Sequence, residues 1–180
     1  MFAPIGKPWW IAGGWAIDLA IGHQTRPHAD IDIAFPRGDV AALRALRERW
    51  ELCVAHDGAL LPWDGGDLLP QHHQFWVRPQ GQQEWAFEVL LEDVDGARWT
   101  YRRDARITMP LAEFGRVTDD GISYVAAPIA LLYKSGSSTR TRDEGDFRAA
   151  LPLLSDTERA WLRDALILVD ATHPWIAPLA

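Results

Sequence analysis

The sequence has a single cysteine, no long apolar run and fewer basic than acidic residues. Cys53 cannot form an internal disulfide, and residues 51–55 around it are typical of a buried strand. No stretch approaches the ~20 apolar residues that cross a bilayer. The first eight residues also lack a basic region followed by an apolar run. These absences predict a cytoplasmic protein without a membrane segment.

The charge balance disfavours nucleic acid as a partner. The 25 Asp and Glu residues against 18 Lys and Arg residues give a formal net charge of −7. Because phosphate backbones are bound mainly by Lys and Arg, this balance disfavours a broad nucleic-acid surface. It favours a cationic small molecule as a partner instead.

The pattern of strands and helices predicts a mixed αβ architecture. Residues 9–12, 26–35 and 51–55 are predicted strands, and residues 15–21 and 39–49 are predicted helices. A long acidic loop is expected over 56–71, and a hairpin over 74–78 and 84–92. We expect an αβ core over residues 1–125 and a helical part over 126–180 that packs on it.

Two carboxylates, Asp30 and Asp32, lie two residues apart on one of these predicted strands. Side chains two apart share a face of a strand, so these two stand side by side while Ile31 and Ile33 face the core. Crowded carboxylates on a mostly apolar strand repel each other and are costly unless a cation lies between them. The pattern therefore predicts a divalent metal ion.

Gly13 and Gly14 lie between the predicted strand 9–12 and the predicted helix 15–21, which Gly22 ends. Such a turn presents backbone N–H groups and the positive end of the helix dipole, which suits a phosphate. About 16 residues separate this turn from the Asp-x-Asp strand.

Together, these two motifs resemble the nucleotidyltransferase superfamily that includes DNA polymerase β, whose shared pattern is a Gly-Gly or Gly-Ser turn followed by Asp-x-Asp. Residues 13–18, 22 and 25–32 resemble the aminoglycoside and lincosamide nucleotidyltransferase group of small bacterial proteins, and residues 85–91, 128–134 and 142–144 extend the resemblance. The resemblance implies an α+β, polymerase β-like fold: a mixed β-sheet flanked by helices, with a small helical C-terminal part.

Glu88 lies in the middle of an otherwise apolar strand, where an unpaired charge is expensive. It is either paired with a nearby arginine or the third carboxylate of the site beside Asp30 and Asp32. We favour the third carboxylate. The superfamily usually has Asp at this position, so Glu is a departure from its pattern.

Basic residues should neutralise the phosphates of a nucleotide. Arg26 lies four residues before Asp30 and can reach phosphates cradled by the backbone of Gly13 and Gly14. Its alternative is a pair with Asp18.

Three further residues are candidates near this site. The resemblance adds Lys134 and Arg142 to the nucleotide-binding residues, although Lys134 could equally be a solvated helix end. His28 either orients a carboxylate or caps a turn.

If Asp30, Asp32 and Glu88 converge, they form a hard-oxygen site suited to Mg²⁺, with two ions clamping the nucleotide's α-phosphate. Asp30 and Asp32 would hold the metals, and Glu88 would ligate one of them or accept the proton of the acceptor hydroxyl.

The predicted function is an Mg²⁺-dependent nucleotidyltransferase. It would move AMP from ATP, or another nucleoside monophosphate from its triphosphate, to a hydroxyl of a small molecule and release pyrophosphate. The resemblance points to an aminoglycoside- or lincosamide-type antibiotic as acceptor and so to antibiotic resistance. The alternatives are a toxin–antitoxin type enzyme that acts on a protein or tRNA, and a non-catalytic nucleotide-binding protein.

Overall fold

The structure, a computed structural model, describes residues 5–136 and 140–180. Its strands are β1 (Trp10–Ile11), β2 (Asp32–Pro36), β3 (Trp50–His56), β4 (Ala59–Pro62), β5 (Gln74–Pro79), β6 (Phe87–Asp95), β7 (Arg98–Thr100), β8 (Thr108–Pro110), β9 (Gly115–Val117) and β10 (Ser123–Val125). Its α-helices are α1 (Gly13–Ile21), α2 (Leu111–Phe114), α3 (Ala127–Lys134), α4 (Thr141–Ala150) and α5 (Asp156–Val169). The structure also contains the 3₁₀ helices η2 (Arg37–Glu48), η3 (Leu151–Leu153) and η4 (Ala177–Leu179). None of the helices in these two ranges combines the length and apolar character that a bilayer crossing requires.

One mixed sheet runs through the described residues in the order β4-β3-β5-β6-β2-β1-β10-β9, and β7 and β8 continue from β6. The predicted hairpin is confirmed, because β5 and β6 pair antiparallel with Gln74 opposite Leu90. β2 and β6 pair in parallel with Asp32 opposite Glu88. The predicted α+β class with a mixed sheet is therefore confirmed.

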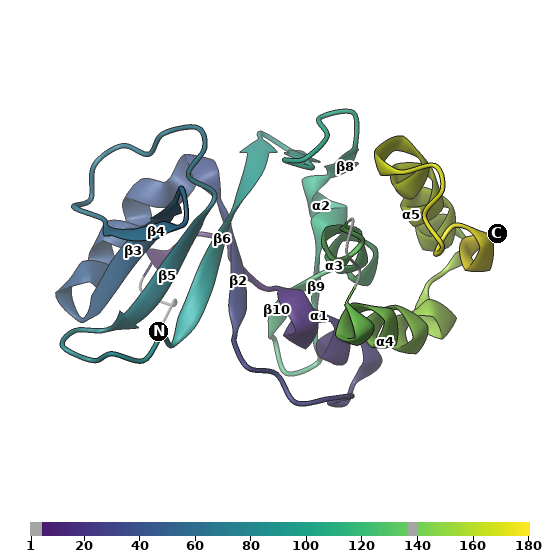
Figure 1. The fold of residues 1–180 in the computed structure, drawn as a ribbon, viewed down its shortest axis with the longest axis horizontal. Helices are drawn as coiled ribbons and strands as arrows, with labels where there is room; N and C mark the ends of the chain where they lie inside the picture. Colours follow the sequence, from purple (N-terminus) through teal and green to yellow (C-terminus); the bar gives the residue numbers. More distant parts are fainter. Residues whose placement is uncertain (1–4, 137–139) are drawn as a thin grey trace.

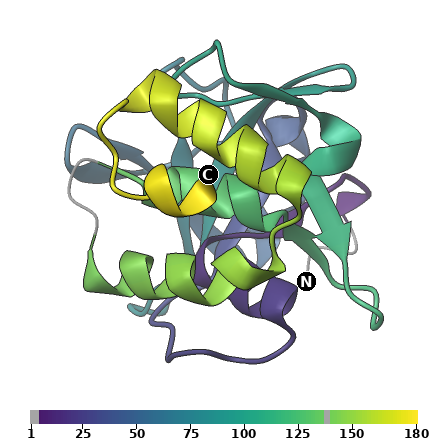
Figure 2. The same cartoon turned by 90° about the vertical axis from the view of Figure 1, so that its right-hand side faces the viewer.

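Two hydrophobic cores lie on opposite faces of this sheet. Alternation along β2 sends Ile33 and Phe35 into the core that η2 covers, while Ala34 enters the core that contains α1 and α3. Figure 1 shows η2, in blue, to the left of β2 and β6, and α3, α4 and α5 to their right. When the molecule is turned, α5 and α4 face the viewer and α3 lies behind them (Figure 2).

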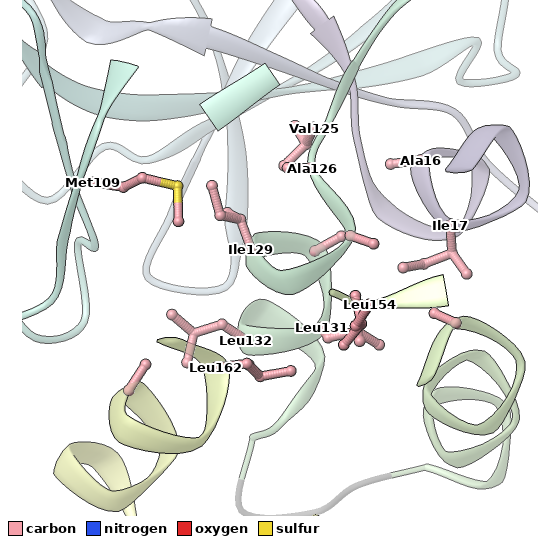
Figure 3. Close-up of a cluster of buried hydrophobic side chains, with 14 of the residues drawn as sticks. Ala16, Ile17, Met109, Val125, Ala126, Ile129, Leu131, Leu132, Leu154 and Leu162 are labelled. Carbon is pink, nitrogen blue, oxygen red and sulfur yellow. The ribbon is translucent and has the colours of Figure 1, made fainter. Parts of the chain in front are cut away.

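Helix α3 is the centre of the larger core. Six of its eight residues are buried, and Pro128 lies in its first turn, where a missing N–H costs no helical hydrogen bond. Figure 3 shows Ile129, Leu131 and Leu132 among side chains from α1, β10 and α5. This packing fixes the position of α3 between α1, β10 and α5, and with it the position of Lys134 at the end of the helix.

The expectation of an unbroken loop over residues 56–71 is wrong. The chain turns back after His56 and forms β4, which pairs antiparallel with β3. Asp57 and Gly58 make this turn with φ of 47° and 77°. Positive φ at both central residues is the geometry of a two-residue hairpin, and Asp-Gly is a strong sequence signal for it. The many turn-forming residues that follow concealed this signal.

Two local expectations need correction. Ile31 is 41% exposed, unlike Ile33, because it precedes the first residue of β2 and lies outside the core that η2 covers. The helix expected over 39–49 is the 3₁₀ helix η2, which begins at Arg37. Asp39 does not cap it; its carboxylate forms an ion pair with Lys7 at 2.7 Å.

The β3–β4 turn gives a test of the fold. Gly58→Ala should lower the stability by about 1 kcal/mol, because an L-residue at this positive φ is strained. For a chain of this size the melting temperature should fall by about 2–4 °C. Gly38→Ala is the matched control, since a Cβ there meets no atom within 4 Å and its φ is not positive. Calorimetric melting of both variants checks the prediction, and equal melting temperatures would contradict it.

Candidate active site

A cleft of about 500 Å³ opens where the start of α1, β2, β6, the end of α3 and the start of α4 meet. Its walls include all but one of the predicted site residues: Gly13, Gly14, Arg26, Asp30, Asp32, Lys134 and Arg142. Glu88 is the exception. It lies on β6 directly opposite Asp32 in the parallel register, and it is half-buried.

Gly13 and Gly14 are the first residues of α1 rather than a separate turn. Gly13 has a φ of +61°, and a Cβ there would overlap the carboxylate of Asp32. A Cβ on Gly14 would overlap the ring of His28 and lie 2.6 Å from Nη2 of Arg26. Both positions therefore need glycine because cleft side chains approach the backbone closely. The first-turn N–H groups of a helix have no partner within it, so they can serve a ligand.

The carboxylates of Asp30, Asp32 and Glu88 act on one another. Burial, followed by the charge of Asp30, raises the pKa of Asp32. Burial, followed by the charges of Asp32 and Asp30, raises the pKa of Glu88 to about 7. A nearby cation would relieve this repulsion, and carboxylate oxygens are ligands that Mg²⁺ prefers.

Glu88 does not form the arginine salt bridge considered from the sequence. No ion pair between residues of the two described ranges involves it, and its Oε2 accepts a hydrogen bond from Nε2 of Gln74 at 3.3 Å. In the same ranges, no three His, Cys, Asp or Glu side chains gather tightly enough to hold a metal ion. Joint ligation by Asp30, Asp32 and Glu88 thus stays a prediction.

Arg26 and Lys134 share one buried partner, Asp146 of α4. Nε and Nη2 of Arg26 each donate to Asp146 at 2.8 Å, and Nζ of Lys134 lies 2.8 Å from the same carboxylate. Burial raises the pKa of Asp146, but these hydrogen bonds outweigh it and leave the pKa below its usual range. Lys134 is therefore a paired side chain and not a freely solvated helix end.

The proposed pair between Arg26 and Asp18 is wrong, because His28 and Thr25 occupy Asp18. Nε2 of His28 lies 2.5 Å from Oδ2 of Asp18, and Oγ1 of Thr25 donates to Oδ1 at 2.6 Å. Burial by itself would raise the pKa of Asp18. The hydrogen bonds with Thr25 and His28 lower this pKa by more, so it lies below its usual range. His28 thus orients a carboxylate, and this fixes the loop that leads to Asp30.

Several cleft residues were not anticipated from the sequence. Asp143 of α4 lines the cleft, and both it and the buried Asp146 form ion pairs with Lys134. Arg102, Arg103 and Tyr133 also line the cleft. The adjacent arginines 102 and 103 were the one available signal, because two neighbouring guanidinium groups suit an anionic ligand.

Known proteins are similar to this chain in part of the sequence and in the fold. A family model described as aminoglycoside-2''-adenylyltransferase matches residues 1–54. The crystal structure of ANT(2'')-Ia in complex with adenylyl-2''-tobramycin superposes with a TM-score of 0.59 over 93% of this chain and 92% of that chain, at 18% identity. The fold is that of the antibiotic nucleotidyltransferases.

Two further relatives agree. The lincomycin-bound crystal structure of the lincosamide antibiotic adenylyltransferase LnuA superposes with a TM-score of 0.57 over 85% of this chain and 91% of that chain, at 16% identity. A 2''-aminoglycoside nucleotidyltransferase from Escherichia coli is 54% identical over 39 residues, which span 20% of this chain and only 22% of that protein. The predicted resemblance to the aminoglycoside and lincosamide nucleotidyltransferases, and the predicted polymerase β-like fold, are confirmed.

The raised pKa of Glu88 predicts a pH dependence of stability. The Glu88 carboxyl has its usual pKa of 4.5 in the unfolded chain and a pKa of about 7 in the folded protein. Between these two pH values the unfolded chain has lost the proton while the folded protein still holds it, so stability falls as the pH rises. Glu88→Gln removes that loss. After allowance for solvent screening, the variant should be about 1 kcal/mol more stable than the wild type at pH 8. This corresponds to a melting temperature higher by about 2–4 °C.

At pH 4 the Glu88→Gln variant and the wild type should melt together, because the glutamate is then protonated in both states. Calorimetry at the two pH values makes the comparison. Glu84→Gln, in the exposed turn before β6, controls for the removal of one negative charge. A stability difference for Glu88→Gln that is the same at both pH values would refute the assignment.

Proposed function

We propose that this protein is a divalent-metal-dependent nucleotidyltransferase that moves a nucleoside monophosphate, AMP from ATP, to a hydroxyl of a small molecule. One observation carries the proposal: the crowded carboxylates of Asp30 and Asp32 share a cleft with the N-terminus of α1 at Gly13 and Gly14. A metal-binding pair and a phosphate-binding helix end are the two parts that nucleotidyl transfer needs.

The triphosphate would lie along the start of α1. The first-turn N–H groups at Gly13 and Gly14 would donate to its oxygens. Lys134 and Arg142 line the same cleft, and their charges are the cationic ones that act most on Asp32. Arg26 would add a further positive charge near the triphosphate, and its guanidinium is held in place by Asp146.

Mg²⁺ fits the donor set, because it binds through one or two carboxylates together with substrate phosphates. Asp30 and Asp32 would hold it, and we propose two ions. A bound metal would neutralise charge on the phosphate oxygens and so lower the barrier to displacement of pyrophosphate from the α-phosphorus.

Glu88 would take the proton in the transfer step. The acceptor hydroxyl oxygen forms a bond to the α-phosphorus, and the bond from this phosphorus to the bridging oxygen of the β-phosphate breaks. Pyrophosphate leaves with that electron pair, and the hydroxyl proton passes to the carboxylate of Glu88. A group with a pKa of about 7 is well matched to proton transfer at neutral pH.

The comparisons support an antibiotic as the acceptor. ANT(2'')-Ia was solved with adenylyl-2''-tobramycin and LnuA with lincomycin, and both share this fold. The matched segment of the curated relative is short, so the acceptor is proposed by analogy of fold.

The first test is calorimetric titration of a non-hydrolysable ATP analogue with Mg²⁺ into the wild type and Asp32→Asn. The wild type should bind only when the metal is present, and the variant should bind at least tenfold more weakly, about 1.4 kcal/mol. Asp95→Asn, an exposed acid at the end of β6 outside the cleft, should bind like the wild type. If the wild type binds no nucleoside triphosphate, the transferase proposal fails.

Gly13 provides a second test. Gly13→Ala should reduce metal-dependent nucleotide binding at least tenfold, because the new Cβ displaces the carboxylate of Asp32. Gly22→Ala is the matched control: Gly22 also has positive φ, at +88°, but a Cβ there would meet no atom within 4 Å. Both variants should lose about 1 kcal/mol of stability from backbone strain. Calorimetry should show that only Gly13→Ala loses nucleotide affinity, and equal affinities would contradict the role of Gly13.

A further inference from the structure

One face of the sheet is open on the side of β3 and β5. Along β3, β5 and β6, alternate side chains enter the core that η2 covers, and the residues between them point to the other face. Within residues 5–136 and 140–180, the larger core on that other face takes no hydrophobic side chain from β3 or β5. Figure 1 shows the reason, because α1, α3, α4 and α5 lie to the right of β2, whereas β3 and β5 lie to its left.

Glu88 lies at the border between this open face and the cleft. The parallel register places it opposite Asp32, which lines the cleft, and the antiparallel register places it opposite Trp76 of β5. Side chains directly opposite one another on paired strands share a face, with Cβ atoms about 5 Å apart. Glu88 is only half-buried although it does not line the cleft, which leaves the open face as the side from which a ligand reaches it. An acceptor can therefore approach Glu88 over β5 while the nucleotide occupies the cleft.

Trp76 gives this face an aromatic ring and an unused hydrogen-bond donor. It is half-buried, and within the described ranges its Nε1 donates no hydrogen bond. The buried polar side-chain atoms without a partner in those ranges belong to His72 and His173, so Nε1 of Trp76 reaches solvent. The face of a Trp ring attracts a ligand cation, and its N–H can donate to a ligand hydroxyl.

Three side chains hold Trp76 in place. Trp85 packs against it in a T-shaped pair, with ring centres 5.8 Å apart and 72° between the planes. The guanidinium carbon of Arg78 lies 4.5 Å from the ring centre of Trp85. Nε and Nη2 of Arg78 donate to the carboxylate of Glu51 at 2.8 and 3.0 Å. Of the two paired rings, Trp76 is the one that has no cation over it in the described chain.

The charges on the open face differ from those of the cleft. The basic residues of the cleft suit a triphosphate. On the open face, the charge of Arg78 is neutralised by Glu51, and Glu88 forms no ion pair with any described residue. This side of the site therefore does not repel a cationic acceptor, which agrees with the formal net charge of −7.

We propose that Trp76 is the platform that binds the acceptor, and that it holds an amino sugar ring whose reacting hydroxyl lies beside Glu88. The inference rests on the proposed function and names the part of the antibiotic acceptor that is bound and the residue that binds it. The ammonium group and the C–H face of the ring would lie on the indole, and Nε1 would donate to a hydroxyl. Because Trp85 and Arg78 already hold the indole in place, little side-chain entropy is lost on binding.

The test measures acceptor binding by calorimetry. The protein is first saturated with Mg²⁺ and the non-hydrolysable ATP analogue, which occupies the cleft. Tobramycin is then titrated as the amino sugar probe, and maltotriose as a neutral saccharide of similar size. The wild type should bind tobramycin at least tenfold more tightly than maltotriose, because only tobramycin carries ammonium groups that the indole face attracts.

Variants assign this binding to Trp76. Trp76→Leu should weaken tobramycin binding at least tenfold, because it removes the aromatic face and the N–H donor. Trp76→Phe should lose less affinity, since it keeps an aromatic face. Trp161→Leu is the matched control, because Trp161 is also half-buried but lies on α5, where its Nε1 donates to the carbonyl oxygen of Thr108. This control should bind tobramycin as the wild type does. All three variants should keep their affinity for the nucleotide analogue, and melting curves check that each one folds.

Several results would overturn the proposal. Equal binding of tobramycin and maltotriose rejects an amino sugar, and an unchanged tobramycin affinity in Trp76→Leu rejects the platform. An equal loss in Trp161→Leu, or a loss of nucleotide affinity in Trp76→Leu, also removes the assignment. So does a wild type that binds the nucleotide analogue but not tobramycin. Failure of the proposed function is distinct, since the wild type would then not bind the nucleotide analogue before any saccharide is added.

Discussion

The cleft depends on one buried carboxylate, that of Asp146. It is 1% exposed, and it receives Arg26 from the loop before β2 and Lys134 from the end of α3. A buried carboxylate without partners costs several kcal/mol, so the two cations stabilise the packing of α4. The same contact therefore joins α3, α4 and the loop that leads to Asp30. Two residues expected to serve a nucleotide are in this way also part of the framework.

A second constraint is the unfavourable placement of like charges on β2 and β6. The fold holds Asp32 opposite Glu88, with Asp30 just before the strand, although burial and mutual repulsion raise the pKa values of Asp32 and Glu88. Packing on both faces of the sheet supplies the energy that keeps them there. Such strain is typical of a site that a cationic ligand completes, and its free energy is then available to binding.

Net charge and local charge differ in this protein. The chain as a whole is acidic, yet its cleft gathers arginines from segments that are far apart in the sequence. Arg26 follows α1, Arg102 follows β7, and Arg142 lies in the first turn of α4. Their proximity follows from the packing of these segments around one cleft, which composition does not encode. Local potential in a cleft, and not net charge, decides which ligand is attracted.

The sequence by itself determined the elements whose signals are local. Gly22 at the end of α1 and the residue patterns of β5 and β6 were sufficient to predict these elements, because each depends on neighbouring residues. Gly13, Gly14, Asp30 and Asp32 were sufficient for the resemblance, but, contrary to the prediction, Asp30 lies before β2 and not on the strand. The Asp57-Gly58 turn was equally local, but the turn-forming residues after it hid its signal. Only the tertiary structure decided that Ile31 is exposed, that His28 holds Asp18, and that Asp146 rather than Asp18 receives Arg26. These outcomes depend on pairs up to 120 residues apart, whose contact is set by how the helices pack on the sheet.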